Sequence, residues 1–207
     1  MYKKKFFIVF EGIEGSGKSF HSKALVKKLK FQKIPCIYLR EPGGSKEAES
    51  IRSFLLKNKN KNFNSLTDTL LYLAARNENV LKKIKPFYKK KIIICDRFVD
   101  STLAYQHYGL GVNRHFINFI NKKILGTIKP DYTFLMNLNV NKSILRISSR
   151  KIINRYDKFK KSFYKRVQKG FLKICNKNKS KYMIINSSNK YKINQDIIFN
   201  RVKKLLK

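Results

Sequence analysis

Short apolar runs alternate with longer amphipathic stretches along most of the 207-residue chain. The short runs are rich in β-branched and aromatic residues and are bounded by polar residues, so they predict strands. The longer stretches repeat apolar residues at helical spacing and predict helices. Alternation of this kind is typical of a parallel sheet covered by helices. The pattern therefore predicts an α/β fold with a five-stranded parallel sheet flanked by helices.

The bounds of these elements follow from the same pattern. The predicted strands are residues 5–11, 35–39, 91–95, 132–138 and 182–185. The predicted helices are residues 18–29, 46–56, 66–84, 113–125, 142–150, 161–174 and 194–206. In the last helix, an apolar stripe at helical spacing should face the core. The stripe consists of Ile197, Ile198, Val202, Leu205 and Leu206.

The chain has no internal repeat and no glycine- or proline-rich linker, so we predict one domain over residues 1–207. Residues 57–64, KNKNKNFN, are low in complexity and charged, which predicts a solvated surface connection. Residues 150–161 interrupt the helical pattern with several basic side chains. We expect this stretch to form a short mobile lid, at about residues 147–160.

The net charge of +36, from 48 basic and 12 acidic residues, raises the question of a polyanionic partner. Basic surfaces attract nucleic acids. A dedicated binding surface should be clustered, whereas the basic residues here are spread along the whole chain among many Asn, Ile and Tyr residues. The distribution favours a general compositional bias, and we expect no specific nucleic-acid partner.

The cysteines and the lengths of the apolar runs indicate the cellular compartment of the protein. Cys36, Cys95 and Cys175 have neither a disulfide framework nor zinc-site spacing, so we expect a reducing compartment. The apolar run near the N-terminus is shorter than the core of a signal peptide. No run reaches the roughly 18 apolar residues of a membrane span. We therefore expect a cytoplasmic protein that does not associate with membranes.

A glycine-rich stretch, FEGIEGSGKS at residues 10–19, joins the first predicted strand to the first predicted helix. It satisfies G-x-x-x-x-G-K-[ST], the phosphate-binding loop. Its glycines let backbone N–H groups face an anion, Lys18 can reach the outer phosphates of a nucleotide, and the Ser19 hydroxyl can hold Mg²⁺. The predicted nucleotide-binding residues are Gly12, Ile13, Glu14, Gly15, Ser16, Gly17, Lys18 and Ser19.

The strand predicted over residues 91–95 runs directly into Asp96 and Arg97. In a parallel sheet, ligand-facing residues follow the carboxyl ends of the strands. Taken alone, an aspartate at a strand end is more often a helix cap or a turn residue. Because the chain also has a phosphate-binding loop, we expect Asp96 to lie beside Ser19 at a magnesium site.

The loop alone leaves the phosphoryl acceptor open, because GTPases, ATPases, motors and small-molecule kinases share it. Together with four further motifs, it resembles the thymidylate kinase family, which transfers a phosphoryl group from ATP to dTMP. The motifs are FEGIEGSGKS, REPGG at 40–44, LLYLAAR at 70–76, DRF at 96–98 and STLAYQ at 101–106. The resemblance covers nearly the whole chain. It implies a three-layer P-loop NTPase-type fold, magnesium dependence and often a homodimer.

The resemblance also assigns residues to the nucleoside of dTMP. Tyr72 matches the aromatic residue that stacks on thymine, which is usually Phe in this family, and tyrosine keeps the stacking face. Thr102 lies where a polar residue reads the thymine ring. Tyr105 lies where an aromatic residue excludes a ribose 2′-hydroxyl, and Glu14 matches a carboxylate that faces the 3′-hydroxyl.

Arginines are assigned to dTMP in the same way. Arg76 and Arg97 match arginines that contact the base edge and the acceptor phosphate. Arg40 and Arg52 are further candidates for the phosphate end. Guanidinium groups suit this task because they grip phosphate through two parallel hydrogen bonds.

Residues 146–155, RISSRKIINR, resemble the arginine-bearing lid of the bacterial subtype whose phosphate-binding loop has no arginine. Position 16 is serine here, so the lid should supply the cation that covers the transferring group. We expect Arg150 and Arg155 to do so, with Arg146 behind them. The predicted catalytic residues are Lys18, Arg97, Arg150 and Arg155.

The chain departs from the family pattern in the loop helix and in the lid. Phe20 and His21 stand where Thr and Gln are usual, and we expect His21 on the helix surface. The usual Asp-Arg pair of the lid reads Asn154-Arg155, which favours looser closure. Two alternatives to a dTMP kinase stay open: another nucleoside monophosphate or deoxynucleoside kinase, and a basic nucleic-acid-binding protein with a vestigial loop.

Overall fold

The fold is built on one parallel sheet with strand order β2-β3-β1-β4-β5. The computed structural model describes residues 5–57, 63–149 and 155–206. The strands are β1 (Phe7–Glu11), β2 (Cys36–Arg40), β3 (Ile92–Asp96), β4 (Tyr132–Asn137) and β5 (Tyr182–Asn186). Each strand pairs in parallel with its neighbours and lies within two residues of its predicted bounds. The prediction of a five-stranded parallel sheet is confirmed.

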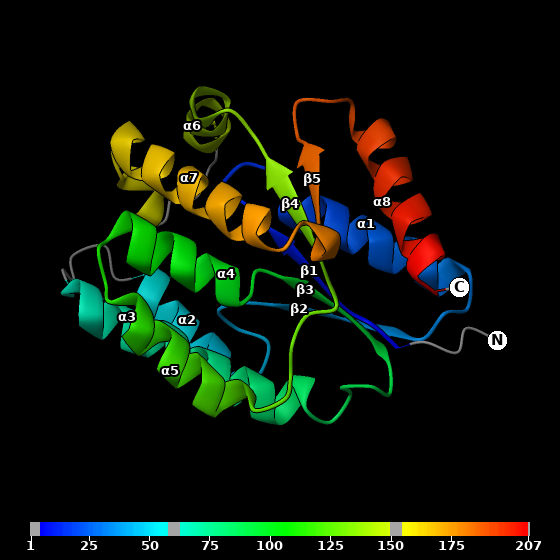
Figure 1. Ribbon diagram of the computed structural model, residues 1–207, viewed down its shortest axis with the longest axis horizontal. Coiled ribbons are helices and arrows are strands. Elements are labelled where there is room, and N and C mark those ends of the chain that lie inside the picture. Colours follow the sequence, from blue (N-terminus) through cyan, green and yellow to red (C-terminus); the bar gives the residue numbers. More distant parts are fainter. Residues whose placement is uncertain (1–4, 58–62, 150–154, 207) are drawn as a thin grey trace.

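Helices cover both faces of this sheet, which gives three layers (Figure 1). α1 and α8 lie together on one face, and the other face carries α3, α4, α5 and α7. The longer helices are α1 (Lys18–Phe31), α2 (Lys46–Lys57), α3 (Ser65–Asn79), α5 (Arg114–Leu125), α6 (Val140–Ser148), α7 (Lys161–Lys177) and α8 (Tyr191–Leu206). α3 continues directly into a π-helical segment, η1 (Val80–Ile84), so the helix predicted over 66–84 is present as α3 and η1 together.

Side chains on the two faces of the central strand, β1, pack in two separate hydrophobic cores. Ile8 and Phe10 are fully buried with residues of α1 and α8, whereas Phe7 and Val9 pack on the opposite face. Successive side chains of a strand point to opposite faces, so a strand covered on both sides must be apolar throughout. This is why the predicted strands appear in the sequence as short continuous apolar runs.

One helical segment follows β3 where the apolar pattern predicted none. α4 (Val99–Thr102) continues into the π-helical η2 (Leu103–Gly109), and η2 packs against α7. Their close approach depends on Gly170, because a Cβ there would lie 2.6 Å from Cδ2 of Tyr108. The segment is stabilised by tertiary packing rather than by an amphipathic pattern of its own.

Two further expectations meet different outcomes. Ile197 is 38% exposed and Leu205 is only partly buried, whereas the buried apolar residues of α8 are Ile198, Phe199, Val202 and Leu206. The surface connection predicted over 57–64 falls largely outside the described residues.

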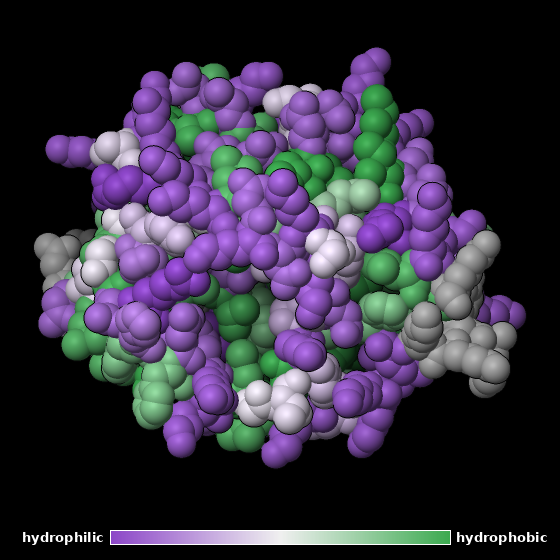
Figure 2. All heavy atoms as spheres, in the orientation of Figure 1, coloured by the Kyte–Doolittle hydropathy of each residue, from purple (hydrophilic) through white to green (hydrophobic). Residues whose placement is uncertain are grey.

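Hydrophilic side chains cover much of the molecular face in Figure 2. Among the described helices, none is long and apolar enough to cross a membrane.

Candidate active site

The loop at residues 12–17 adopts backbone conformations that favour glycine. Gly12, Gly15 and Gly17 have φ angles of 137°, 70° and 87°. A Cβ at Gly12 would overlap the carbonyl oxygen of Met136 on the neighbouring strand. A glycine is therefore needed where the loop crosses the end of β4. The loop leads into α1, whose N-terminal N–H groups can bind an anion.

Lys18 is almost completely buried at the start of α1. Its Nζ donates to the carbonyl oxygen of Ile13 at 2.7 Å and lies 3.4 Å from the Ser16 hydroxyl. Burial, followed by the neighbouring Arg97 guanidinium, lowers the pKa of Lys18 to about 7. A polyphosphate beside this lysine would favour its charged form and reverse that shift.

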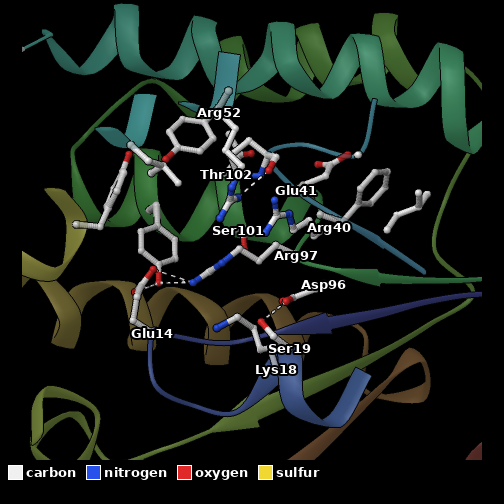
Figure 3. Close-up of a pocket in the computed structure, with 18 of the residues that line it drawn as sticks. Glu14, Lys18, Ser19, Arg40, Glu41, Arg52, Asp96, Arg97, Ser101 and Thr102 are labelled. Atoms are coloured by element: carbon white, nitrogen blue, oxygen red, sulfur yellow. Dashed lines mark hydrogen bonds and ion pairs between the residues drawn. The ribbon is translucent and has the colours of Figure 1, made fainter. Parts of the chain in front are cut away.

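Ser19 and Asp96 meet at the carboxyl end of β3, as predicted (Figure 3). The Ser19 hydroxyl donates to Oδ2 of Asp96. The other carboxylate oxygen, Oδ1, is buried and has no hydrogen-bond partner among the described residues. Hydroxyl and carboxylate oxygens are the ligands Mg²⁺ prefers, and Mg²⁺ usually takes only one or two from the protein. The pair therefore fits a magnesium site completed by phosphate and water oxygens.

Arg97 lies at the centre of the polar site, next to the phosphate-binding loop (Figure 3). Its φ angle of 70° is rare for a residue with a side chain, and such strain clusters at functional sites. Nη2 donates to Oε1 of Glu14 at 2.7 Å, and Nη1 donates to the Ser101 hydroxyl at 3.1 Å. The Tyr105 hydroxyl donates to the other oxygen of Glu14. Arg97, Glu14 and Tyr105 thus form one connected polar group.

Glu11 holds the segment that carries Arg97, a role the sequence did not indicate. Its Oε1 accepts from the backbone N–H groups of Phe98 at 2.8 Å and Ser101 at 3.2 Å. Its Oε2 accepts from the Ser101 hydroxyl at 2.6 Å. Burial, followed by the neighbouring Asp100 carboxylate, raises the pKa of Glu11 to about 8. Its place in the glycine-loop motif, at the end of a strand, was the only sequence signal.

Arg76 lies deep in the site and is nearly completely buried. Its Nε donates to Oε2 of Glu41 at 2.7 Å, and its two terminal nitrogens donate to Asn121 and to the carbonyl oxygen of Phe98. These bonds use three of the five guanidinium N–H groups. Glu41 was visible in the sequence only as part of REPGG, and its partner is 35 positions away.

A cavity of about 720 Å³ brings the predicted residues together in front of the loop. Most of the predicted site residues line it: Glu14, Gly15, Gly17, Lys18, Ser19, Arg40, Tyr72, Arg76, Asp96, Arg97, Thr102 and Tyr105. Arg40 is bonded to Glu49, with Nη2 2.9 Å from Oε2. Gly12, Ile13 and Ser16 are buried within the loop. Sequence reasoning did not assign a role to Gln106 and Tyr156, which also line the cavity.

The lid arginines have different outcomes. Arg146 contacts the loop through Nη1, which donates to the carbonyl oxygen of Gly15 at 3.0 Å. Arg150 and Asn154 lie outside the described residues. Arg155 begins the 3₁₀ turn η3 (Arg155–Lys158), and its side chain is likewise outside them.

The expectation for His21 was wrong. It is only 6% exposed, and burial lowers its pKa. It packs behind the loop, where its Cδ2 would be 3.4 Å from a Cβ at Gly17. A position one turn into a helix does not by itself tell which face is covered.

Comparison with known proteins gives one consistent result. Residues 10–198 match the family described as thymidylate kinase. The chain is 41% identical over 187 residues to "Thymidylate kinase" of Onion yellows phytoplasma, covering 89% of each chain. It is 40% identical over 197 residues to "Thymidylate kinase" of Ehrlichia chaffeensis, covering 93% of this chain and 94% of the relative. The crystal structure of thymidylate kinase from Ehrlichia chaffeensis superposes with a TM-score of 0.78, at 32% identity, over 97% of this chain and 99% of that one.

Proposed function

The chain belongs to the thymidylate kinase family, and from this premise we propose how its residues carry out the family's reaction. It is an ATP-dependent phosphotransferase that moves the γ-phosphoryl group of ATP to dTMP, giving dTDP and ADP. The observation that carries the assignment of residues is the shared cavity. Lys18 of the phosphate-binding loop and the residues matched to dTMP line one space of about 720 Å³.

The loop is proposed to hold the donor. Its amides and the start of α1 face the phosphates of ATP, and Lys18 exchanges its bond to Ile13 for the outer phosphates. The burial of Lys18 favours this exchange, because a buried ammonium gains most from a nearby anion.

The nucleoside of dTMP is proposed to bind between Tyr72 and Tyr105. The Tyr72 ring offers a face for stacking on thymine, and Thr102 offers a hydroxyl beside it. The two remaining donors of Arg76 can reach the base edge. Tyr105 is held against Glu14 and leaves little room for a ribose 2′-hydroxyl, while Glu14 accepts from the 3′-hydroxyl.

Phosphoryl transfer then depends on position and charge rather than on proton transfer. The acceptor is an anionic phosphate oxygen, so no strong general base is required. Arg97 orients the acceptor phosphate, with Arg40 and Arg52 at the same end. We propose that Lys18 and the lid arginines Arg150 and Arg155 neutralise the charge that spreads over the migrating group.

Magnesium would be held by Ser19 and Asp96. When bound, it would neutralise part of the phosphate charge. The buried, unpartnered Oδ1 of Asp96 supports this assignment. The Ser19 hydroxyl, which donates to Asp96 in the structure, would turn its oxygen lone pair to the ion.

The function is tested by measuring ADP release with dTMP, dUMP, AMP, GMP and thymidine supplied in turn. Preferred turnover of dTMP is expected. A preference for AMP or GMP, or turnover of thymidine alone, would contradict the substrate assignment. Steeply salt-dependent binding to DNA without any ADP release would instead favour the nucleic-acid-binding alternative.

We further propose that the protein is a cytoplasmic homodimer. Leu66 and Leu70 lie one turn apart on α3 and are 49% and 46% exposed. Phe119 on the neighbouring α5 is 58% exposed. Exposed apolar residues on adjacent helices suit an interface with a second copy. The three cysteines are free and buried, which suits a reducing compartment.

A further inference from the structure

A buried group of polar side chains supports the end of the cavity assigned to the nucleobase. Its centre is the hydroxyl of Tyr156, which follows the predicted lid arginines in the sequence. This hydroxyl donates to Oδ2 of Asp68 on α3 at 2.6 Å. The amide Nε2 of Gln106, on η2, donates to the same hydroxyl at 3.2 Å. Tyr156, Asp68 and Gln106 are each less than 5% exposed.

Tyr72 packs against Tyr156. The two rings meet edge to face, with centroids 6.0 Å apart. Tyr156 also meets the Tyr105 ring edge to face at 5.8 Å. Tyr156 therefore touches three residues that line the cavity: Tyr72, Tyr105 and Gln106.

Stacking on a base requires the ring of Tyr72, and the edge-to-face contact with Tyr156 limits the orientation of that ring. A buried hydroxyl bonded to a carboxylate is a directional anchor, since breaking it would leave a buried polar group unsatisfied. The backbone carbonyl of Tyr156 is itself held by the Tyr164 hydroxyl at 2.8 Å. The anchor thus joins α3, η2 and η3 at one point.

We propose that Tyr156 is a positioning residue for the nucleobase of dTMP. Its ring packs against the Tyr72 ring and limits the orientation of that ring, and its hydroxyl fixes the Gln106 amide beside the base. This inference rests on the proposed function, because it deepens the assignment of the thymine site. It places the specificity of the base site partly in a residue within the predicted lid.

The test compares Tyr156→Phe, Gln106→Ala and the double variant with the unmodified protein. Tyr132→Phe is the matched control: it removes a buried tyrosine hydroxyl, bonded to Arg201 Nε at 2.9 Å, from the opposite end of the sheet. KM for dTMP, KM for ATP and kcat are measured for each protein. The rise in melting temperature caused by dTMP gives a binding readout that does not depend on turnover.

For Tyr156→Phe we expect KM for dTMP to rise about fivefold to tenfold, an effect of the size of one buried hydrogen bond, with KM for ATP and kcat within about twofold. The stabilisation by dTMP should shrink in parallel. In the Gln106→Ala background, adding Tyr156→Phe should raise KM for dTMP by less than about threefold, because the two residues act together. Tyr132→Phe should change neither KM.

Two results would overturn the proposal. One is an unchanged KM for dTMP in Tyr156→Phe, and the other is an equal rise in both KM values, as general loosening of the structure would give. Should Tyr156→Phe not fold, Gln106→Ala still removes the amide that the Tyr156 hydroxyl holds, and an unchanged KM for dTMP there would also overturn it. If the unmodified protein does not act on dTMP, the proposed function fails instead, so the two failures are distinguishable.

Discussion

Arg97 and Glu14 form a largely buried ion pair, with Nη2 2.7 Å from Oε1. The pair joins the end of β3 to the phosphate-binding loop. Arg97 also donates to the carbonyl oxygen of Gly12 at 3.2 Å, so one guanidinium has two contacts with the loop. The group assigned to the acceptor phosphate is therefore fixed to the element that holds the donor. Such rigid alignment suits a reaction that depends on in-line positioning.

Replacing Arg97 with alanine should mainly weaken dTMP binding. We expect KM for dTMP to rise by about tenfold or more, because the acceptor phosphate loses a charge-assisted bond and Glu14 loses its ion-pair partner. KM for ATP should change less. Steady-state kinetics with each substrate varied in turn measures this, with Arg201→Ala as a remote arginine control. An unchanged dependence on dTMP would remove Arg97 from the acceptor site.

The lowered pKa of Lys18 predicts proton uptake when ATP binds. Without ATP, most Lys18 side chains are neutral above their pKa of about 7. The triphosphate favours the charged ammonium, so ATP binding at about pH 8 should bring a proton from solvent, whereas at about pH 6 it should not. Affinity for ATP should therefore fall as the pH rises above 7. Calorimetry in two buffers of different ionisation enthalpy measures the uptake.

Lys18→Met provides the control for this measurement. Methionine has similar length but no proton to gain, so the uptake at about pH 8 should disappear and kcat should fall by about a hundredfold or more. Uptake that persists in Lys18→Met would assign the proton to another group.

The raised pKa of Glu11 predicts a pH-dependent stability. The folded-state pKa is about 8 against an ordinary value of 4.5. Between these values the folded state binds more protons than the unfolded state, so this carboxyl lowers the free energy of unfolding as the pH rises through that window. Glu11→Gln resembles the protonated form and should flatten the decline. Urea unfolding at about pH 5, 6.5 and 8 compares the slopes.

Glu78→Gln serves as the matched substitution, because Glu78 lies on α3 in an ion pair with Lys82 at 3.1 Å that is partly open to solvent. The free energy of unfolding of Glu78→Gln should change with pH as it does for the unmodified protein. Equal slopes for Glu11→Gln and the unmodified protein would show that Glu11 is ionised throughout.

The proposed homodimer depends on the exposed face of α3. Leu70→Glu places a charge there and should convert a dimer into a monomer, which light scattering after size-exclusion chromatography would detect. Leu145→Glu, at a residue 69% exposed on α6, should leave the molecular mass measured for the dimer unchanged. A monomeric unmodified protein, or a dimer that tolerates Leu70→Glu, would contradict the interface.

Local sequence was enough to predict the sheet and the phosphate-binding loop. A strand buried on both faces must be a short apolar run, and β1 and β3 are recognisable for that reason. The loop requires glycines, a lysine and a hydroxyl at fixed spacing within eight residues, so the whole signal lies in one stretch of the chain. The aspartate at the end of β3 could be placed beside Ser19 because parallel strands end at the same edge.

Only the tertiary structure decided which polar groups are paired. Glu11 meets Phe98, Arg76 meets Glu41, and Tyr156 meets Asp68 across 87, 35 and 88 positions. A hydrogen bond depends on distance and direction in space, and neither is encoded in the residue types nearby. The same reason explains why the apolar pattern did not predict α4 and η2, and why it did not show that His21 is buried. The segment α4–η2 is stabilised by packing against α7, which is distant in sequence. His21 is buried because its side of α1 is covered by the rest of the protein.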